Sequence, residues 1–282
     1  MIHFRNLKVT TMTCIIYLSC SVYIQRLFYL LPVIENETIT NGKIVSLRYN
    51  TLYRGNMFKA SQLPFRNCIT INIVMDRKLI SVKIFSKGKI QMCGLISKEM
   101  AQKTMEKIVE YIQEIQKMLQ RIHEEPIESP EVIRFVLDAL NHEASWQELL
   151  EWDRVYNGEI QYKIKKVMVN FNYDLGFSVN RAEFAKQFNK IPGFKARYTN
   201  SSDYCVYLRY YEEERKHMFI IYKSGLVTQS GPNEKYMEHA YQVFHETVKK
   251  LRQYVMKPKQ DYRKLKFIPV AQNLLACPVK LK

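Results

Sequence analysis

The amino-acid sequence predicts an α+β protein made of two related halves, in which antiparallel strands are followed by a long amphipathic helix. The first observation is an internal repeat, because residues 68–94 align with residues 205–231 without a gap at an offset of 137 positions (205 − 68). Cysteine, isoleucine and glycine recur at matching places. A long unit that occurs only twice favours two fused, pseudo-symmetric halves over a solenoid of short repeats.

The repeated segment has the pattern of three strands joined by tight turns. Isoleucines alternate with residues such as Thr70 and Asn72, which is the period of two typical of a half-buried strand. Gly88 lies in the second turn, where glycine takes a positive φ without strain. The predicted strands cover residues 69–74, 79–85 and 89–93, with turns at 76–78 and 86–88.

A long helix is the second observation, and it follows the strands in both copies. Apolar residues recur at spacings of 4-3-4-3-4, which places them on one stripe of a helix that can cover the isoleucine face of the sheet. The offset between the copies becomes 136 here, so the second copy is one residue shorter. The stripe consists of Ala101, Met105, Ile108, Ile112, Ile115 and Leu119 in the first copy and Met237, Tyr241, Phe244, Val248, Leu251 and Val255 in the second.

Each half also begins with a predicted strand and helix, at residues 8–18 and 21–31 in the first half and at 166–173 and 178–189 in the second. Ser178 is the predicted N-cap of the last of these helices. The half-unit is therefore strand, helix, about four antiparallel strands, helix. The expected domains are a first repeat (1–122), an inserted helical linker (123–160), a second repeat (161–256) and a basic tail (257–282).

The charge of the chain indicates a polyanionic partner. Its 282 residues carry a formal net charge of +16, with 47% hydrophobic and 25% charged residues, as in a globular protein. Such a surplus favours nucleic acid or an anionic membrane surface, and a merely solvated basic surface is the simpler alternative.

No motif of a known catalytic or cofactor site is present, so we expect neither enzymatic activity nor a bound cofactor or metal. The six cysteines are scattered without zinc-ligand spacing, which favours free thiols in a reducing, intracellular compartment. Residues 12–33 are apolar enough to pass for a membrane span, but Gln25 and Arg26 interrupt them, and we expect no membrane insertion.

The duplicated strand–turn–strand resembles the signature of the TATA-box-binding protein (TBP) family. Residues 84–89 read Ile-Phe-Ser-Lys-Gly-Lys and are followed by Gly94, and residues 221–225 read Ile-Tyr-Lys-Ser-Gly and are followed by Gly231. The resemblance covers residues 5–119 and 164–255 and is nearest to the divergent members found in large nucleocytoplasmic DNA viruses. It implies an intracellular place of action, in the host nucleus or in a cytoplasmic viral factory, or carriage in the virion.

The resemblance implies a saddle in which about ten antiparallel strands form a curved sheet with helices on its convex side. It also implies that the concave side binds the minor groove of double-stranded DNA, where aromatic wedges open base steps. The implied partners are DNA, an RNA polymerase and a TFIIB-like factor, and the implied state is a monomer with pseudo-twofold symmetry.

Carried over by position, the resemblance assigns DNA-binding roles on the concave face. Phe85 and Tyr222 correspond to two inserting phenylalanines, and Cys68 and Cys205 stand at the other two, where Phe65 is a possible substitute for the first. The positions of two groove-reading asparagines hold Lys8 and Lys166, while groove-lining threonines are replaced by Cys93 and Ser230. The remaining candidates are Lys89, at a phosphate-contacting position, and Arg209.

Other positions depart from the family pattern. Leu226 replaces a phosphate-contacting lysine, and Val74 and Tyr211 replace phosphate-binding arginines. The first hypothesis is therefore a transcription-initiation factor that binds and bends promoter DNA. The alternative is a protein-docking module that kept the fold and lost specific DNA binding, and a third interpretation is an accessory domain of a repair enzyme or nuclease.

Overall fold

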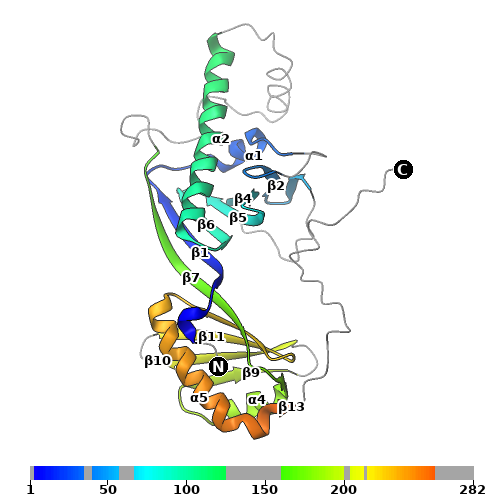
Figure 1. Ribbon diagram of the computed structural model, residues 1–282. Coiled ribbons are helices and arrows are strands. Elements are labelled where there is room, and N and C mark those ends of the chain that lie inside the picture. Colours follow the sequence, from blue (N-terminus) through cyan, green and yellow to red (C-terminus); the bar gives the residue numbers. More distant parts are fainter. Residues whose placement is uncertain are drawn as a thin grey trace, which may run out of the picture. The chain divides into compact units, whose positions relative to one another are not determined.

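The computed structural model describes residues 3–34, 40–56, 67–124, 160–199, 204–212 and 215–257. These residues form an antiparallel eleven-stranded sheet and four α-helices, which confirms the predicted α+β class (Figure 1). The strand order is β3-β2-β4-β5-β6-β1-β7-β12-β11-β10-β9, and a separate two-stranded sheet joins β13 to β8. Most of the predicted linker and tail, and Phe65, lie outside the described residues.

The first repeat contains six strands and two α-helices, preceded by a short 3-10 helix. Its sheet order places β1 beside β6, so the leading strand closes the repeat on one side while β3 forms the edge on the other. In chain order, the elements are η1 (Phe4–Asn6), β1 (Val9–Leu18), α1 (Ile24–Leu30), β2 (Ile44–Tyr49), β3 (Leu52–Gly55), β4 (Cys68–Met75), β5 (Lys78–Phe85), β6 (Lys89–Leu95) and α2 (Lys98–Glu124).

The second repeat follows the same plan without a counterpart of β3. This additional edge strand brings the main sheet to eleven strands where about ten were expected. In chain order, the elements are β7 (Tyr162–Asp174), β8 (Ser178–Val179), α4 (Arg181–Phe188), β9 (Phe194–Arg197), β10 (Cys205–Glu212), β11 (Arg215–Tyr222), β12 (Leu226–Gly231), α5 (Glu234–Val255) and β13 (Met256–Lys257).

The chain divides into two compact units, which we describe separately. Unit 1 comprises Met1–Phe171 with Ser230–His239, and unit 2 comprises Asn172–Gln229 with Ala240–Lys282. The division cuts across the sequence repeat, because the start of β7 pairs with β1 and belongs to unit 1.

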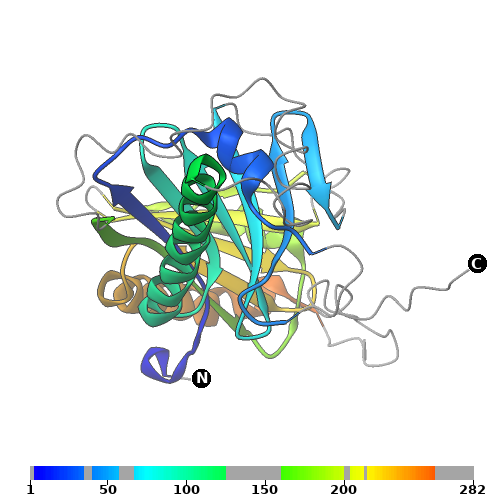
Figure 2. The ribbon, with the colours of Figure 1, turned by 90° about the horizontal axis from the view of Figure 1, so that it is seen from above.

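Unit 1 has an aliphatic core between its strands and its helices. Figure 2 shows α1 and α2 lying across one face of these strands. Ile71, Val82 and Ile90 are fully buried on that face, and Ile108 of α2 is fully buried as well. The β-branched residues explain both the strands and the packing, since they suit a half-buried pleated surface and fill the space beneath a helix.

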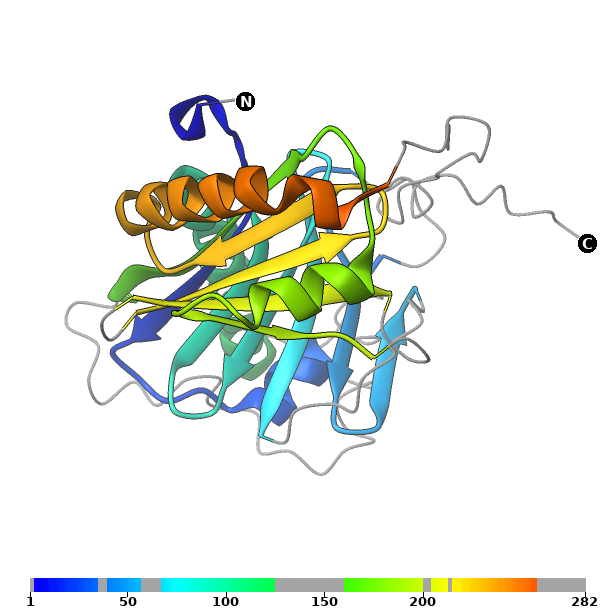
Figure 3. The same cartoon turned by 90° about the horizontal axis from the view of Figure 1, so that it is seen from below.

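Unit 2 has an aromatic core instead. Figure 3 shows α4 and α5 lying against the strands of this unit. The rings of Phe219 on β11 and Phe244 on α5 stack with centroids 4.5 Å apart, and Phe184 stacks on Phe188 within α4 at 4.3 Å. Phe244 also contacts Phe188, with centroids 5.9 Å apart, so one ring joins both helices to the sheet.

Three backbone hydrogen bonds recur in both repeats and fix the same hairpin turn. In the first repeat, the amide of Leu18 donates to Gly88 O at 2.9 Å, and in the second the amide of Leu175 donates to Gly225 O at 3.0 Å. The second equivalent pair consists of Val22 N donating to Ser86 O and Val179 N donating to Lys223 O. The third consists of Gly88 N donating to Phe85 O and Gly225 N donating to Tyr222 O. The leading strands therefore correspond at an offset of 157 (175 − 18).

Two glycines are required at these turns. Gly88 has φ +74° and Gly225 has φ +94°, and a Cβ atom would lie 2.2 Å from the carbonyl oxygen of Cys20 at the first and 2.1 Å from that of Phe177 at the second. Both the backbone conformation and the close approach exclude other residues. The duplication seen in the sequence is thus also a duplication of local geometry.

The structure corrects the predicted start of the fourth helix. Ser178 is not its N-cap, because it lies in β8 and pairs with Lys257 of β13. The helix begins at Arg181, and the side chain of Asn180 accepts a hydrogen bond from the amide of Glu183. Among the described helices, none has both the length and the apolar character needed to cross a membrane.

Candidate nucleic-acid interface

The face of each unit's strands that is turned away from its helices is called the open face here. Its members follow from the strand registers and from the alternation of burial along each strand. In unit 1, the open face includes Ser46, Arg48, Thr70, Asn72, Ser81, Lys83, Phe85, Lys89, Gln91, Cys93, Thr13, Ile15, Tyr17, Lys163, Lys165 and Asn170.

The open face of unit 1 is cationic. Its lysines and arginine come from four different strands, at Arg48, Lys83, Lys89, Lys163 and Lys165, and no carboxylate occurs among its described positions. The acidic residues of this unit's long helix, such as Glu106 and Glu110, lie on an element that packs on the opposite face. Helix α2 carries charges of both signs, whereas the described charged residues of the open face are all basic, so the open face attracts anions.

The predicted wedge Phe85 lies on the open face at the end of β5, half-buried, next to the turn at Gly88. Its register partner on β4 is Cys68, which is only 2% exposed. Burial raises the pKa of the Cys68 thiol, since the thiolate would lose its hydration. The geometry leaves Phe85 as the accessible member of this pair.

Lys166 requires a correction, because it does not lie on the open face. Its register partner is the fully buried Cys14, and its ammonium forms an ion pair with Glu234 at the start of α5. Partial burial is the largest single influence and acts to raise the pKa of Glu234, but the hydrogen bond and charge of Lys166, a backbone hydrogen bond and the charge of Lys98 together outweigh it, so the net shift is downward. This lysine is engaged on the helix side of the sheet.

Lys165 takes the place that had been predicted for Lys166. It pairs with Ile15, whose other partner is Gln91, and it is exposed on the open face. At the structural offset of 157, Lys8 corresponds to Lys165 (165 − 8), so the two predicted lysines are not equivalent. A shift of one residue moves a strand side chain to the opposite face, which is the physical reason for the error.

The other predicted residues of unit 1 have definite positions. Lys8 is exposed just before β1, and Lys89 is exposed at the start of β6. Cys93 is half-buried, and its sulfur accepts hydrogen bonds from Thr13 Oγ1 at 3.7 Å and from Gln91 Nε2 at 3.5 Å. It is thus a member of a polar group at the middle of the open face.

Unit 2 has an open face of different composition. Tyr222 ends β11 half-buried beside Cys205, which is 5% exposed, and this pair repeats the arrangement of Phe85 and Cys68. The predicted Ser230 is half-buried on β12, in the part of that strand that belongs to unit 1. The cations of the unit 2 open face gather at the outer strands β9 and β10, where the exposed Arg209 is the register partner of Lys195.

A further arginine of unit 2 stacks on an aromatic ring. The guanidinium of Arg197 lies 4.9 Å from the centroid of the Tyr207 ring, and the two residues are register partners on β9 and β10. A cation–π contact of this kind holds the side chain over the sheet without neutralising its charge. Three cations thus lie close together on this edge.

Sequence reasoning missed several open-face residues. Tyr17 and Lys163 are register partners on β1 and β7, and Asn170 donates a hydrogen bond from Nδ2 to Thr11 Oγ1 at 2.7 Å. The period of two in residues 8–18 and 162–170 indicates two alternating sets of side chains, one on each face of the sheet. Only the strand pairing shows which of the two sets lies on the open face.

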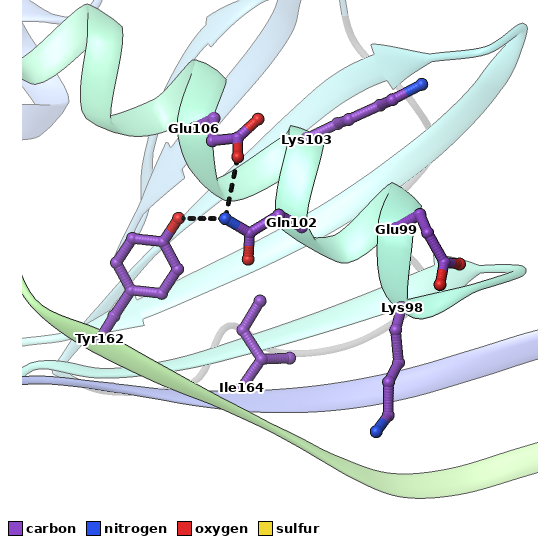
Figure 4. A pocket seen from close by; sticks show the side chains of 7 residues that line it. All are labelled: Lys98, Glu99, Gln102, Lys103, Glu106, Tyr162 and Ile164. Atoms are coloured by element: carbon purple, nitrogen blue, oxygen red, sulfur yellow. Dashed lines mark hydrogen bonds between the residues drawn. The ribbon is translucent and has the colours of Figure 1, made fainter.

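A shallow pocket lies on the helix side of unit 1, between α2 and the start of β7 (Figure 4). The amide nitrogen of Gln102 donates to Glu106 Oε1 at 2.8 Å and to Tyr162 Oη at 2.9 Å. The remaining lining residues are Lys98, Glu99, Lys103 and Ile164. Its charges are of both signs, and Gln102, Glu106 and Tyr162 are hydrogen-bonded to one another, so it offers no convergent set for catalysis.

In the part of the chain that the structure describes, no group of histidine, cysteine or acidic side chains is arranged to hold a metal ion. The fold and the open faces define a duplicated α+β protein with a cationic sheet surface.

Comparison with known proteins supports the resemblance seen in the sequence. The chain is 22% identical over 256 residues to a protein named "TATA-box-binding protein-like" from Acanthamoeba polyphaga mimivirus, and the match covers 86% of this chain. It spans only 59% of the length of that relative. The predicted resemblance to TBP-like proteins is thus confirmed with a relative of viral origin.

Among solved structures, the chain is similar to the TBP of Methanococcus jannaschii. The TM-score is 0.47 at 14% sequence identity, and the match covers 86% of this chain and 98% of that one. No protein-family model matches the sequence.

Proposed function

We propose that this chain is a TBP-like transcription factor that binds double-stranded promoter DNA through its open faces. The observation that carries the proposal is the distribution of charge, since the open face of unit 1 has five cations and no described carboxylate. The name of the mimivirus relative supports the same role. Phosphate attraction of this kind supplies affinity that depends on salt and not on sequence.

The cations of unit 2 also support an anionic ligand. Arg209 and Lys195 are direct register partners on adjacent strands. Like charges placed opposite each other destabilise a sheet, so such a pair favours a site where a bound anion offsets the repulsion. A phosphate of the DNA backbone is the anion that the proposal requires.

The half-buried rings of Phe85 and Tyr222 would act as wedges, one in each unit. Each ring has an apolar face and ends a strand beside a tight turn, at equivalent places in the two units. Cys68 and Cys205 are too small and too buried to open a base step. The family has two pairs of wedges and this protein has one ring in each pair, so it would bend DNA less, because a single ring opens each base step less widely.

The proposed partners of the DNA complex are an RNA polymerase and a TFIIB-like factor, in an intracellular site of viral transcription. These partners follow from the resemblance alone. The helix faces of the two units, where α2 and α5 carry charges of both signs, are the surfaces left for them when DNA occupies the open faces.

The test is a titration of fluorescent A·T-rich and G·C-rich duplexes at several salt concentrations. The wild-type protein should prefer the A·T-rich duplex, and the double variant Phe85→Ala, Tyr222→Ala should lose about tenfold in affinity for it. Tyr254→Ala, which removes a tyrosine from α5 on the helix side, is the matched control. Equal affinity of the wedge variant and the wild type would exclude the wedge mechanism.

A second candidate function is a protein-docking module without specific DNA binding. The burial of Cys68 and Cys205 at two wedge positions favours it. Absence of any duplex binding at low salt, together with capture of purified polymerase subunits, would select this alternative.

A further inference from the structure

At one end of the unit 1 open face, an exposed aromatic ring lies between two lysines. Tyr17 is 48% exposed although it lies on β1, which has paired strands on both sides. Its register partner on β6 is Lys89, and its register partner on β7 is Lys163. Both lysines are exposed. We call the three residues the Tyr17 row.

The spacing of the Tyr17 row suits one nucleotide and its two phosphates. Neighbouring strands lie about 4.8 Å apart, so the two lysines are separated by roughly 10 Å with the ring between them. Side chains directly opposite each other on antiparallel strands are within contact range. A base stacked on the ring would therefore have an ammonium group on each side.

The backbone around the row is well fixed. Leu18, the next residue after Tyr17, donates its amide to Gly88 O at 2.9 Å, and Ser19 donates to Gln161 O at 3.2 Å. These bonds tie the end of β1 to the turn before Lys89 and to the residue before β7. The row is thus part of a sheet end whose backbone is held by hydrogen bonds, so ligand binding need not order the backbone beneath the ring.

The second unit has the same backbone with different side chains. At the structural offset of 157, the counterpart of Tyr17 is Asp174 (174 − 17), and at the hairpin offset of 137 the counterpart of Lys89 is Leu226 (226 − 89). Both are exposed. An acid and a leucine cannot hold an anionic, stacking ligand, so the Tyr17 row is a property of unit 1 alone.

In a duplex whose base steps are closed, the bases are stacked on one another and present only their edges, so no π-face is free for such a ring. An unpaired base has a free π-face, and stacking on an aromatic side chain combined with backbone contacts to lysine is how single strands are bound without sequence preference. An exposed aromatic ring between two lysines therefore suits an unpaired nucleotide.

From these observations we infer that the Tyr17 row is a binding site for single-stranded nucleic acid, with Tyr17 stacking on an unpaired base and Lys89 and Lys163 holding the adjacent phosphates. The inference builds on the proposed role of the open face in DNA binding. It adds an activity toward unpaired strands, such as those exposed when a promoter duplex opens.

The test uses the full chain and fluorescent oligo(dT), oligo(dA) and oligo(rU) 12-mers in anisotropy titrations. Tyr17→Leu should lower the affinity for all three about tenfold, whereas Tyr17→Phe should keep the wild-type affinity because it retains the ring. Tyr254→Leu, at an equally exposed tyrosine on α5, should have no effect. Thermal melting of each variant verifies that the fold is intact.

The charges are tested in the same way. The double variant Lys89→Gln, Lys163→Gln should weaken binding and make it less dependent on salt, whereas Lys249→Gln, Lys250→Gln removes the same charge from exposed positions of α5 and should do neither. Comparison of the DNA oligonucleotides with oligo(rU) shows whether the site prefers DNA or RNA.

Equal single-strand affinity for the wild type and Tyr17→Leu, or no single-strand binding by the wild type at low salt, would overturn the inference. The duplex titration described above is separate. Duplex binding without single-strand binding would support the proposed function and contradict the inferred single-strand site. Single-strand binding without duplex binding would support the single-strand site and contradict the proposed function.

Discussion

The two repeats share a backbone plan but fill it with different side chains. Ile108 on α2 corresponds to Phe244 on α5 (244 − 136), and Val82 on β5 corresponds to Phe219 on β11 (219 − 137). Two fully buried aliphatic residues of unit 1 are thus replaced by a stacked aromatic pair in unit 2. The turns, in contrast, are kept with hydrogen bonds that differ by 0.1 Å or less.

This contrast shows what the fold requires. Backbone positions with positive φ and close carbonyl contacts admit only glycine, so they are the same in both halves. Core positions need only apolar groups of suitable total volume and so vary between the halves. The open faces, which are not needed for packing, differ most.

Truncation of the aromatic core should give the largest effect on stability. Phe244→Ala should lower the free energy of unfolding by about 4 kcal/mol, because Phe244 is fully buried and contacts rings from three elements. Ile108→Ala removes fewer atoms and should cost about 3 kcal/mol. Urea unfolding of both variants measures the difference, and an equal or larger loss for the isoleucine would contradict the packing described for the two units.

The turn glycines should give nearly equal effects in the two repeats. Gly88→Ala and Gly225→Ala should each cost about 3 kcal/mol, because the added Cβ meets a carbonyl oxygen and the φ angle is positive. Gly176→Ala is the control, since φ is also positive there but nothing lies within 4 Å, and about 1 kcal/mol is expected. Thermal and urea unfolding test this, and a mild effect at only one of the two turns would break their equivalence.

The third prediction concerns His245, one of two buried histidines among the described residues of unit 2. His245 packs against Tyr173, Tyr241 and Phe244, and its Nε2 has no hydrogen-bond partner among the described residues. Burial lowers its pKa from 6.5 to about 4. Below pH 6.5 the unfolded chain therefore binds a proton that the folded chain does not, and stability falls as the pH falls.

Between pH 7 and pH 5 the free energy of unfolding should fall by about 2 kcal/mol. His245→Val, which copies the equivalent Val109 of α2 (245 − 136), should remove this slope. Unfolding curves at pH 7, 6 and 5 compare the two proteins above the range in which carboxylates titrate. A slope unchanged in the variant would mean that another group is responsible.

The smallest effects should distinguish two neighbouring lysines. Lys165→Gln should reduce the salt dependence of duplex binding by about one counterion, because Lys165 is on the open face. Lys166→Gln should leave that dependence unchanged and cost about 0.5 kcal/mol of stability through the lost pair with Glu234. If the two variants exchanged their effects, the register of β7 would be wrong.

Much of the fold could be predicted from the sequence because its signals are local. The alternation of isoleucines and the turn glycines gave the strands from β4 to β6 and their copies, and the apolar stripes gave α2 and α5. β3 was missed as a separate strand, since its four residues at the sheet edge carry little pattern. Ser178 was misassigned because its partner Lys257 comes from a distant part of the sequence.

The candidate site was only partly predictable for the same reason. Phe85 and Tyr222 were correctly predicted to occupy equivalent strand ends because the repeat aligns there without gaps. Lys166 was misplaced because the β1–β7 pairing contains register shifts, and the face of a strand residue depends on that pairing. Tyr17 and Lys163 come together only when strands from the two halves of the sequence pair.

That pairing has a consequence for how the protein is made. Tyr17 and its β7 partner Lys163 are 146 positions apart (163 − 17), although they are neighbours in one sheet. During synthesis, β1 leaves the ribosome early and has one edge without its strand partner for roughly 7 to 30 seconds at ordinary elongation rates. An open strand edge promotes association with other chains, so translation speed through the intervening segment sets how long the newborn chain is exposed to that hazard.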